Sequence, residues 1–323
     1  MRAVFVTAYG GPENLELREL PRPEPARDRL LVRVDAAGVN FHDVIERRGG
    51  YPGQPEPPIR VGLEAAGEVV EVGTDATGVS VGDRVVWAME PGSHAELVEV
   101  PVDAAVTLPP GIETTTAAAL FSQGLTAHYL TNALHRFQPG ETALVWAAAG
   151  GVGRLLTQML TAQGGRVIAA VSTEEKLAAA RSAGAILATR YEDAGDAVEE
   201  ITDGAGVDVV FDGVGAPTFG RSLAYVRRRG LVVVFGAAGG KVPPVELSQL
   251  SGAGSVRLVR PRLVDFIADR DELLRRANDL FASLADGDFD VSIGGTFPLS
   301  AVADAHRALE SRATSGKLIL IPD

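Results

Sequence analysis

The chain has 323 residues, 46 % of them hydrophobic and 22 % charged, which is enough to bury the cores of about two domains. Its formal net charge of −12 and the lack of a basic run argue against a nucleic acid as the main partner. The absence of cysteine excludes disulfides, thiol nucleophiles and cysteine-ligated zinc. No apolar run of about 20 residues predicts a transmembrane helix, and no signal-peptide pattern precedes the first strand, so we expect a cytoplasmic protein without a membrane partner.

Residues 1 to about 110 contain short apolar or alternating runs separated by glycine and proline, which is typical of a β-rich module. The predicted strands are Met1–Thr7, Leu15–Glu19, Leu30–Ala37, Gly62–Val72, Asp83–Ala88 and Ala95–Val100. After Pro109-Pro110-Gly111 the pattern changes, and two helices are predicted over Ile112–Ser122 and Gly124–Ala133.

From Thr142 onward, strands and helices alternate, which predicts an α/β domain with a doubly wound parallel sheet. The predicted strands are Ala143–Ala147, Arg166–Val171, Ala185–Ala188, Val207–Asp212 and Leu231–Gly236. After Arg260-Pro261 the pattern breaks again: Asp269 and Glu272 are spaced to cap a helix, and Lys317–Ile321 is a final strand. We expect this α/β domain to be inserted into the β-rich module, with the C-terminal segment returning to that module.

A short glycine motif lies between a predicted strand and a predicted helix. Ala148, Gly150 and Gly153 follow the strand Ala143–Ala147, and an apolar periodic segment follows them up to Gly164. Strand, glycine turn and helix in this order favour a dinucleotide site, because small residues let the backbone approach a pyrophosphate and the helix start offers free N–H groups. The alternative is an ordinary βα turn, since Ala148 replaces the usual first glycine.

The residues after the next strand bear on the choice of cofactor. The strand Arg166–Val171 ends without the carboxylate that usually binds a free ribose 2′-hydroxyl. Ser172 and Lys176 follow instead, and this pattern favours the 2′-phosphate of NADPH over NADH. Ser172 and Glu175 also have capping-box spacing, which predicts a helix from this point through Ala180. The alternative is that Lys176 is a solvated helix charge.

Several longer motifs cover essentially the whole chain. They include G-V-N-F-H-D at Gly38–Asp43, G-L-E-A-A-G at Gly62–Gly67, V-G-D-R-V at Val81–Val85, Q-G-L-T-A at Gln123–Ala127 and A-A-A-G-G-V-G at Ala147–Gly153. With them the chain resembles the medium-chain dehydrogenase/reductase superfamily, and within it the zinc-free quinone oxidoreductase branch that includes zeta-crystallin. The resemblance implies a GroES-like β-rich catalytic domain at 1–123, completed by 262–323, and an inserted Rossmann domain at 124–261.

The resemblance also bears on zinc. Zinc-dependent relatives have a cysteine at the position of Asn40 and a G-H-E motif at Gly62–Glu64, so both metal-binding side chains are missing here. The five histidines form no H-x-x-x-H pair, and each is better explained as a satisfied or exposed residue. We expect no metal, and without a Lewis acid alcohol dehydrogenation becomes an unfavourable assignment.

The catalytic residues that the resemblance implies lie on the segment Asn40–Tyr51, over which the acceptor sits in similar proteins. Asn40 is expected to donate a hydrogen bond to the substrate or the nicotinamide ribose, and Tyr51 to present its phenol to the acceptor. Asp43 either contributes to the site or braces the loop. The structural alternatives are a loop cap for Asn40 and a rim aromatic for Tyr51. Relatives often have tyrosine at Ile45, so a more apolar pocket is expected here.

The resemblance likewise implies a set of cofactor-binding residues, which fall into groups along the chain. Those near the nicotinamide are Gln123 and Thr126, and those lining the pyrophosphate are Gly150, Gly151 and Val152. Those holding the 2′-phosphate are Ser172, Lys176 and Tyr191. Those beneath or against the cofactor are Val214, Gly215, Phe235, Gly236 and Ala237, and those in segments that close over it are Arg260 and Lys317.

The leading hypothesis is an NADPH-dependent quinone oxidoreductase that transfers hydride without zinc to a small-molecule quinone or conjugated carbonyl. An NADPH-dependent enone or 2-alkenal double-bond reductase is the alternative within enzymes, and a non-enzymatic, cofactor-binding, crystallin-like protein is the alternative of another class. Similar proteins are usually homodimers, and the resemblance implies pairing through an edge formed by Leu231–Phe235 and Val242–Leu247.

Overall fold

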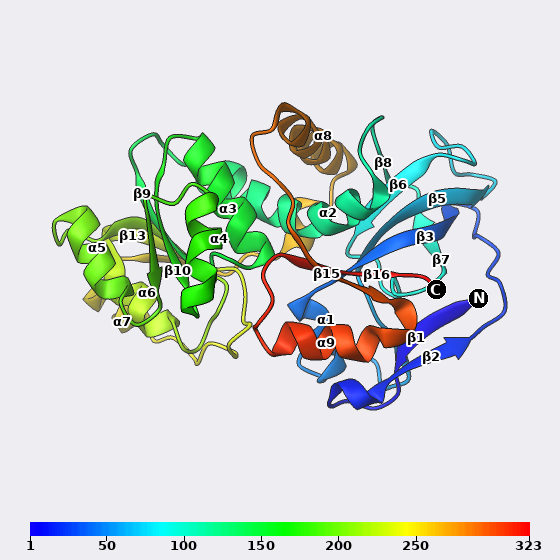
Figure 1. Cartoon of the computed structure of the whole chain (residues 1–323), viewed down its shortest axis with the longest axis horizontal. Helices are drawn as coiled ribbons and strands as arrows, with labels where there is room; N and C mark the ends of the chain where they lie inside the picture. The colour runs from blue at the N-terminus through cyan, green and yellow to red at the C-terminus, as the bar shows by residue number, and fades with distance from the viewer. The chain divides into compact units, whose positions relative to one another are not determined.

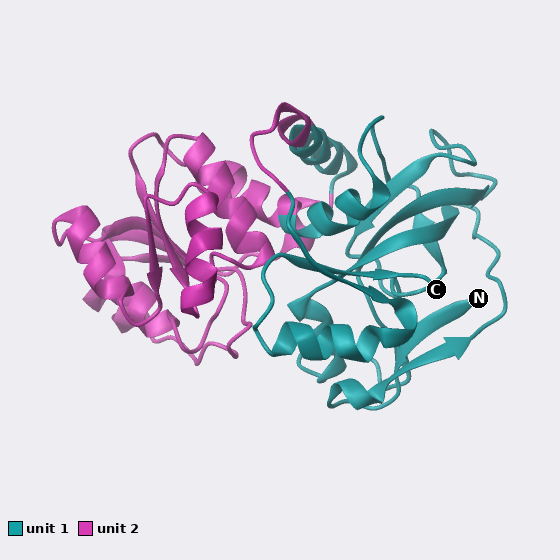
Figure 2. Cartoon of the chain, viewed as in Figure 1, with its two compact units in different colours: residues 1–123, 269–281, 291–323 teal, residues 124–268, 282–290 magenta.

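The computed structural model describes residues 1–323, which form two compact units. Unit 1 comprises residues 1–123, 269–281 and 291–323, and unit 2 comprises residues 124–268 and 282–290 (Figure 2). Each unit is built around its own sheets and its own buried core. No helix of the chain is long and apolar enough to span a membrane.

Unit 1 is β-rich and contains two sheets (Figure 1). The three-stranded sheet has the order β2-β1-β4, and its strands are β1 (Arg2–Val6), β2 (Leu15–Glu19) and β4 (Ile59–Arg60). The seven-stranded sheet has the order β15-β16-β3-β5-β6-β8, with β7 also paired to β3. Its strands are β3 (Arg29–Val39), β5 (Glu64–Val72), β6 (Arg84–Ala88), β7 (Leu97–Pro101), β8 (Val106–Thr107), β15 (Ile293–Pro298) and β16 (Lys317–Ile321).

The large sheet pairs the last strand of the chain with a strand near its start, and this pairing brings together the residues of the site described below. β16 pairs antiparallel with β3, whose other neighbour is β5. Alternate residues of β3, such as Leu30, Val32 and Val34, belong to the core of this unit, and Leu31 on the other face is buried as well. The helices of this unit are α1 (Phe41–Arg47), α9 (Val302–Glu310) and the first parts of α2 (Thr114–Tyr129) and α8 (Arg270–Asp286).

Unit 2 holds a six-stranded sheet whose strands are all parallel, in the order β11-β10-β9-β12-β13-β14. The strands are β9 (Thr142–Trp146), β10 (Arg166–Val171), β11 (Leu187–Arg190), β12 (Val207–Asp212), β13 (Val226–Val234) and β14 (Arg257–Val259). Counted from β9, this is the 3-2-1-4-5-6 order of dinucleotide-binding domains. The expected α/β fold with a doubly wound sheet is therefore confirmed.

The helices of unit 2 connect these strands and cover the sheet, so its strands are almost continuously apolar (Figure 1). They are α3 (Gly151–Ala162), α4 (Leu177–Ser182), α5 (Ala194–Thr202), α6 (Phe219–Tyr225) and α7 (Leu247–Gly252). The predicted cap of the later helix is also confirmed, because Asp269 Oδ1 accepts the Glu272 backbone N–H at 2.9 Å at the start of α8.

The two helices predicted around Gln123 and the capping box predicted at Ser172 differ from the structure. The helices expected on either side of Gln123 form one helix, α2 (Thr114–Tyr129), which passes into a π-helical turn at Leu130–Leu134. The single glycine at Gly124 does not break it, since an interior glycine costs only about 1 kcal/mol and the buried residues around it keep helical spacing. The capping box at Ser172 does not form: the chain stays extended through Thr173, which precedes a 3₁₀ turn at Glu174–Lys176.

The edge expected for dimerisation is also different. Leu231–Phe235 belongs largely to β13, which is an interior strand because it pairs with β12 on one side and β14 on the other. The edge strand at this end of the sheet is β14, a three-residue strand that periodicity does not reveal. Val242–Leu247 contains no strand.

Candidate active site

The predicted cofactor residues of unit 2 gather at one edge of the sheet. Almost all of them follow the carboxyl end of a parallel strand, and such ends lie along the same edge, where open α/β sheets bind ligands. Strand by strand, β9 is followed by Gly150, Gly151 and Val152; β10 by Ser172 and Lys176; β11 by Tyr191; β12 by Val214 and Gly215; β13 by Phe235, Gly236 and Ala237; and β14 by Arg260. Gln123 and Thr126 lie one turn apart on α2.

The turn from β9 into α3 is tight. Ala147 has a left-handed backbone (φ 57), and Gly150 is the N-cap residue of α3. Gly153 leaves no room for a side chain, because a Cβ there would lie 2.8 Å from Cα of Ala148 and closer still to the carbonyl oxygen of Ala147. The first turn of α3 contains no acidic residue, so its N–H groups and helix dipole favour an anion at this point.

A group of polar side chains lies where β10 and β11 end. The Lys176 ammonium lies 3.5 Å from Ser172 Oγ, and the Tyr191 ring packs edge-on against Trp146. Sequence reasoning missed Arg190, the last residue of β11, which pairs in register with Val171. One Arg190 nitrogen forms an ion pair with Glu192, but its Nε is buried and has no hydrogen-bond partner. The sequence did contain a signal for Arg190, because it is a basic residue at the end of a strand and precedes Tyr191, a predicted cofactor-binding residue.

Beneath the β12 end, Asp212 holds the loop that contains Val214 and Gly215. Its carboxylate is fully buried and accepts both backbone N–H groups of these residues at 2.9 Å. It also accepts hydrogen bonds from the hydroxyls of Thr218 and Ser222 at 2.8 Å. The backbone N–H groups of Val214 and Gly215 are therefore engaged within the protein and are not available to a ligand.

The β13 and β14 ends are also fixed by backbone contacts. Phe235 N–H donates to the carbonyl oxygen of Asp212 at 2.9 Å, and the exposed Arg260 donates from Nη1 to the carbonyl oxygen of Val234 at 3.0 Å. Gly236 lies so close to Gly213 that a Cβ on it would be 2.9 Å from Gly213 Cα. These close approaches bring the β12 and β13 loops together at the carboxyl edge.

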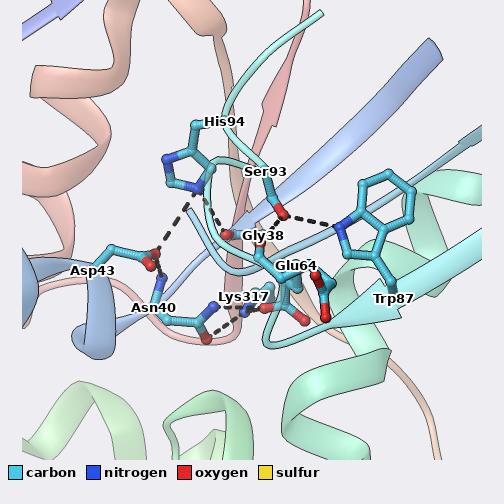
Figure 3. Close-up of polar contacts among 9 residues, drawn as sticks. Gly38, Asn40, Asp43, Glu64, Trp87, Ser93, His94 and Lys317 are labelled. Carbon is cyan, nitrogen blue, oxygen red and sulfur yellow. Dashed lines mark hydrogen bonds and ion pairs between the residues drawn. The ribbon is translucent and has the colours of Figure 1, made fainter. Parts of the chain in front are cut away.

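In unit 1, Asn40 lies in a buried polar cluster with Glu64 and Lys317 (Figure 3). Asn40 Nδ2 donates to Glu64 Oε1 at 2.7 Å, and Lys317 Nζ donates to Asn40 Oδ1 at 2.7 Å. Lys317 also forms an ion pair with Glu64, and the two side chains are 1 % and 0 % exposed. The second oxygen of Glu64 accepts the backbone N–H of Ser122 at 2.9 Å.

The sheet explains why these residues meet. Asn40 directly follows β3, Glu64 begins β5 and Lys317 begins β16, and β3 lies between the other two strands. Sequence reasoning placed Lys317 over the cofactor, but its ammonium contacts Asn40 and Glu64 of its own unit. Glu64 entered that reasoning only within the G-L-E-A-A-G motif and the lost zinc motif, without a role of its own.

Asp43 and His94 lie next to this cluster and are both fully buried. Asp43 Oδ2 accepts the Asn40 backbone N–H at 2.7 Å, which braces the start of α1. Burial raises the pKa of Asp43 to about 8, although the Asn40 hydrogen bond and the Lys317 charge oppose the rise. Burial lowers the pKa of His94 to about 4, and its Nε2 donates to the carbonyl oxygen of Gly38 at 3.1 Å.

Tyr51 lies on the loop after α1 and contacts a histidine that sequence reasoning left without a role. Its hydroxyl lies 3.1 Å from His42 Nδ1, and the two rings stack at 4.4 Å. Burial lowers the pKa of His42 to about 4, so the ring is neutral near pH 7. Ile45 is half-buried on α1 between His42 and this loop.

The raised pKa of Asp43 gives a testable pH dependence. The folded state keeps this carboxyl protonated up to about pH 8, whereas the unfolded chain releases the proton near pH 3.8. Between these values the folded state binds more protons, so its stability falls as the pH rises. We expect the free energy of unfolding to decline from pH 6.5 to 8, with the Asp43 share at most about 1.4 kcal/mol per pH unit. Urea denaturation at several pH values measures it.

The isosteric variant Asp43→Asn is the control for this prediction. It keeps an oxygen for the Asn40 N–H but does not titrate, so its decline between pH 6.5 and 8 should be shallower than that of the wild type. Glu46, whose pKa is raised to about 7 by burial, accounts for part of the remaining slope. Equal slopes for Asp43→Asn and the wild type would show that Asp43 does not hold a proton in the folded state.

The site contains no arrangement suited to a metal. No group of three or more histidine, cysteine, aspartate or glutamate side chains in the chain is placed to hold a metal ion. The cation nearest Asn40 and Glu64 is the ammonium of Lys317.

The comparisons with known proteins agree with this architecture. Residues 26–110 match the family model described as alcohol dehydrogenase GroES-like domain, and residues 151–279 match the one described as zinc-binding dehydrogenase. Quinone oxidoreductase 1 of Escherichia coli is 40 % identical over 97 % of each chain, and 2-haloacrylate reductase of a Burkholderia species is 36 % identical over 99 % of this chain and 98 % of its own.

Among solved structures, the quinone oxidoreductase of Escherichia coli complexed with NADPH superposes with a TM-score of 0.97 at 39 % identity, covering all of both chains. The likeness therefore extends over both units and is not limited to the nucleotide fold. The GroES-like and Rossmann-like parts that the motifs predicted are confirmed. The chain belongs to the quinone oxidoreductase branch of the medium-chain dehydrogenase/reductase superfamily.

Proposed function

We propose that this protein is an NADPH-dependent quinone oxidoreductase. The observation that carries the proposal is the full-length likeness to quinone oxidoreductases, one of them solved in complex with NADPH. The geometry supports it, because residues suited to a dinucleotide follow every strand of the parallel sheet at one edge.

The residues present fit NADPH. The α3 N-terminus, with Gly150, Gly151 and Val152, suits the pyrophosphate. Ser172, Lys176 and Tyr191 suit the 2′-phosphate, and we add Arg190, whose buried Nε has no partner within the protein. Gln123, Thr126, Val214, Gly215, Phe235, Gly236, Ala237 and Arg260 are proposed as the remaining contacts.

Bound NADPH supplies a hydride to the quinone. With one proton from the medium, this reaction gives the hydroquinone and NADP⁺. Asn40 would donate its remaining amide hydrogen toward the oxygen on which negative charge develops. Tyr51 would present its phenol to the acceptor, oriented by the neutral ring of His42. Asp43 would act by bracing Asn40 through its backbone.

A second candidate, the reduction of an electron-poor carbon–carbon double bond, is favoured by the 36 % identity to 2-haloacrylate reductase. Ile45 carries no polar group, so the segment around it is more apolar than a tyrosine there would make it. The chemistry differs only in where hydride and proton add: the hydride goes to the β-carbon and the proton to the α-carbon.

Oxidation of NADPH and NADH by the purified protein tests both candidates. We expect rapid NADPH oxidation with 1,4-benzoquinone, a preference for NADPH over NADH, and the same rate with added zinc or chelator. Turnover of 2-chloroacrylate or a 2-alkenal without turnover of quinones would move the assignment to the second candidate. Tight NADPH binding without turnover of any acceptor would favour a non-enzymatic role.

We further propose a homodimer in the cytoplasm. The three-residue edge strand β14 has one side without a strand partner, which is suited to pairing with a second copy. The cytoplasm is proposed because a chain without cysteine gains no disulfide from an oxidising compartment. Analytical ultracentrifugation at micromolar concentration tests the dimer.

A further inference from the structure

The side-chain amide of Asn40 is held by two partners with opposite hydrogen-bonding chemistry. Lys317 is a donor only, and it faces the amide oxygen. Ionised Glu64 is an acceptor only, and it faces the amide nitrogen. If the amide were flipped, its NH₂ group would face the Lys317 ammonium and its oxygen would face the Glu64 carboxylate, so both hydrogen bonds would be lost. Both partners therefore select the same orientation of Asn40.

Glu64 and Lys317, which together form a clamp on the Asn40 amide, are themselves held in place. Glu64 is anchored through its second oxygen to the Ser122 backbone, and its ion pair with Lys317 is almost completely buried. Gly38 provides the space for the pair, because a Cβ there would lie 2.7 Å from Lys317 Cε and closer still to Glu64 Oε1. Because both ions are buried, each one left alone would carry a large desolvation cost, so the pair stays together.

Only one amide hydrogen of Asn40 is used by this clamp. The other has no partner within the protein, and Asn40 is half-buried, unlike Glu64 and Lys317. We propose that Glu64 and Lys317 are positioning residues, which act through Asn40 by fixing its amide so that the remaining N–H is presented to the acceptor. The inference rests on the proposed function. It gives Lys317 a positioning role in place of the contact with the cofactor that the sequence suggested.

Kinetics in a double-mutant cycle test the proposal. Lys317→Met removes the ammonium and keeps the length of the side chain, and we expect kcat/KM for 1,4-benzoquinone to fall about 10- to 100-fold, as for loss of one charge-assisted contact. In an Asn40→Ala background the same change should have almost no further effect, because Lys317 acts through Asn40. Lys241→Met, which removes an exposed ammonium, is the matched control and should keep wild-type activity.

Gly38→Ala provides a second variant that keeps all three polar side chains. Its added methyl group displaces Glu64 and Lys317, so kcat/KM should fall as in Lys317→Met and again not in the Asn40→Ala background. Circular dichroism and thermal unfolding show whether each variant folds. If Lys317→Met or Gly38→Ala does not fold, the kinetics of the other variant test the proposal. Equal losses with and without Asn40 would overturn the proposal, since they would indicate an effect on the fold or on another contact.

A spectroscopic readout is independent of turnover. The chain has four asparagines, Asn14, Asn40, Asn132 and Asn278, so ¹⁵N-asparagine labelling gives four side-chain amide pairs, and Asn40→Ala identifies the relevant one. We expect the Asn40 amide hydrogens to exchange at least tenfold faster in Lys317→Met and Gly38→Ala than in the wild type. Unchanged Asn40 signals in both variants would overturn the clamp, even if the wild type reduces quinones. Altered signals in a protein that reduces no quinone would support the clamp and reject the proposed function alone.

Discussion

Replacement of Gly153 by alanine is expected to abolish tight NADPH binding and to destabilise unit 2. A Cβ at this position would meet backbone atoms of Ala147 and Ala148, which cannot rotate away as a flexible side chain can. α3 would have to move away from the end of β9, and an overpacked position of this kind costs about 2 to 3 kcal/mol. The same shift would move the helix N-terminus from the proposed pyrophosphate position. Urea denaturation and NADPH fluorescence titration measure the two effects.

Gly220→Ala is the matched control for this prediction. Gly220 lies on α6, its backbone is helical, and a Cβ there meets nothing within 4 Å. The substitution should be neutral or stabilise the helix by up to about 1 kcal/mol, with unchanged NADPH affinity. If Gly153→Ala kept both the stability and the NADPH affinity of the wild type, the close approach of α3 to β9 would not hold in solution.

The elements of unit 2 could be predicted well because each strand is a short, apolar run bounded by turn residues. β10 and β12 have the predicted limits, since Val167–Val171 and Val209–Asp212 are buried on both faces and are followed by Ser172 and Gly213. β14 was missed because three residues show no period, and the resulting error moved the sheet edge to β13. Helix α2 was predicted as two helices, Ile112–Ser122 and Gly124–Ala133, whereas the buried residues around Gly124 keep it continuous despite the unfavourable propensity of one glycine.

The candidate site could be predicted only where its residues follow local motifs. The glycine turn, Ser172 and Lys176 are read from the chain within a few positions of a strand. The partners of Asn40 could not be read in this way, because Lys317 is 277 residues away and reaches it only through the pairing of β16 with β3. His42 was passed over because nothing in its own neighbours shows that the Tyr51 ring stacks on it.

Removal of the positive charges at the ends of β10 and β11 is expected to erase the preference for NADPH over NADH. The proposed 2′-phosphate carries almost two negative charges, and each charge-assisted contact to it is worth about 1.5 to 3 kcal/mol. Lys176→Gln and Arg190→Gln should each weaken NADPH binding by about tenfold or more, since about 1.4 kcal/mol corresponds to a factor of ten. NADH lacks the phosphate, so its affinity should stay the same. Fluorescence titration with both cofactors measures this difference.

The control for these variants lies on the same strand at its other end. Arg166 begins β10, is exposed, and donates to the carbonyl oxygen of Ile201 at 3.0 Å, so Arg166→Gln removes one positive charge from the opposite edge of the sheet. It should leave the affinities for both cofactors unchanged, apart from a small general effect of charge that salt screens. Equal losses of NADH and NADPH affinity in Lys176→Gln would show that this lysine contacts a part common to both cofactors. If only Arg190→Gln lost affinity for NADPH and kept its affinity for NADH, the phosphate contact would belong to Arg190, which the sequence patterns did not reveal.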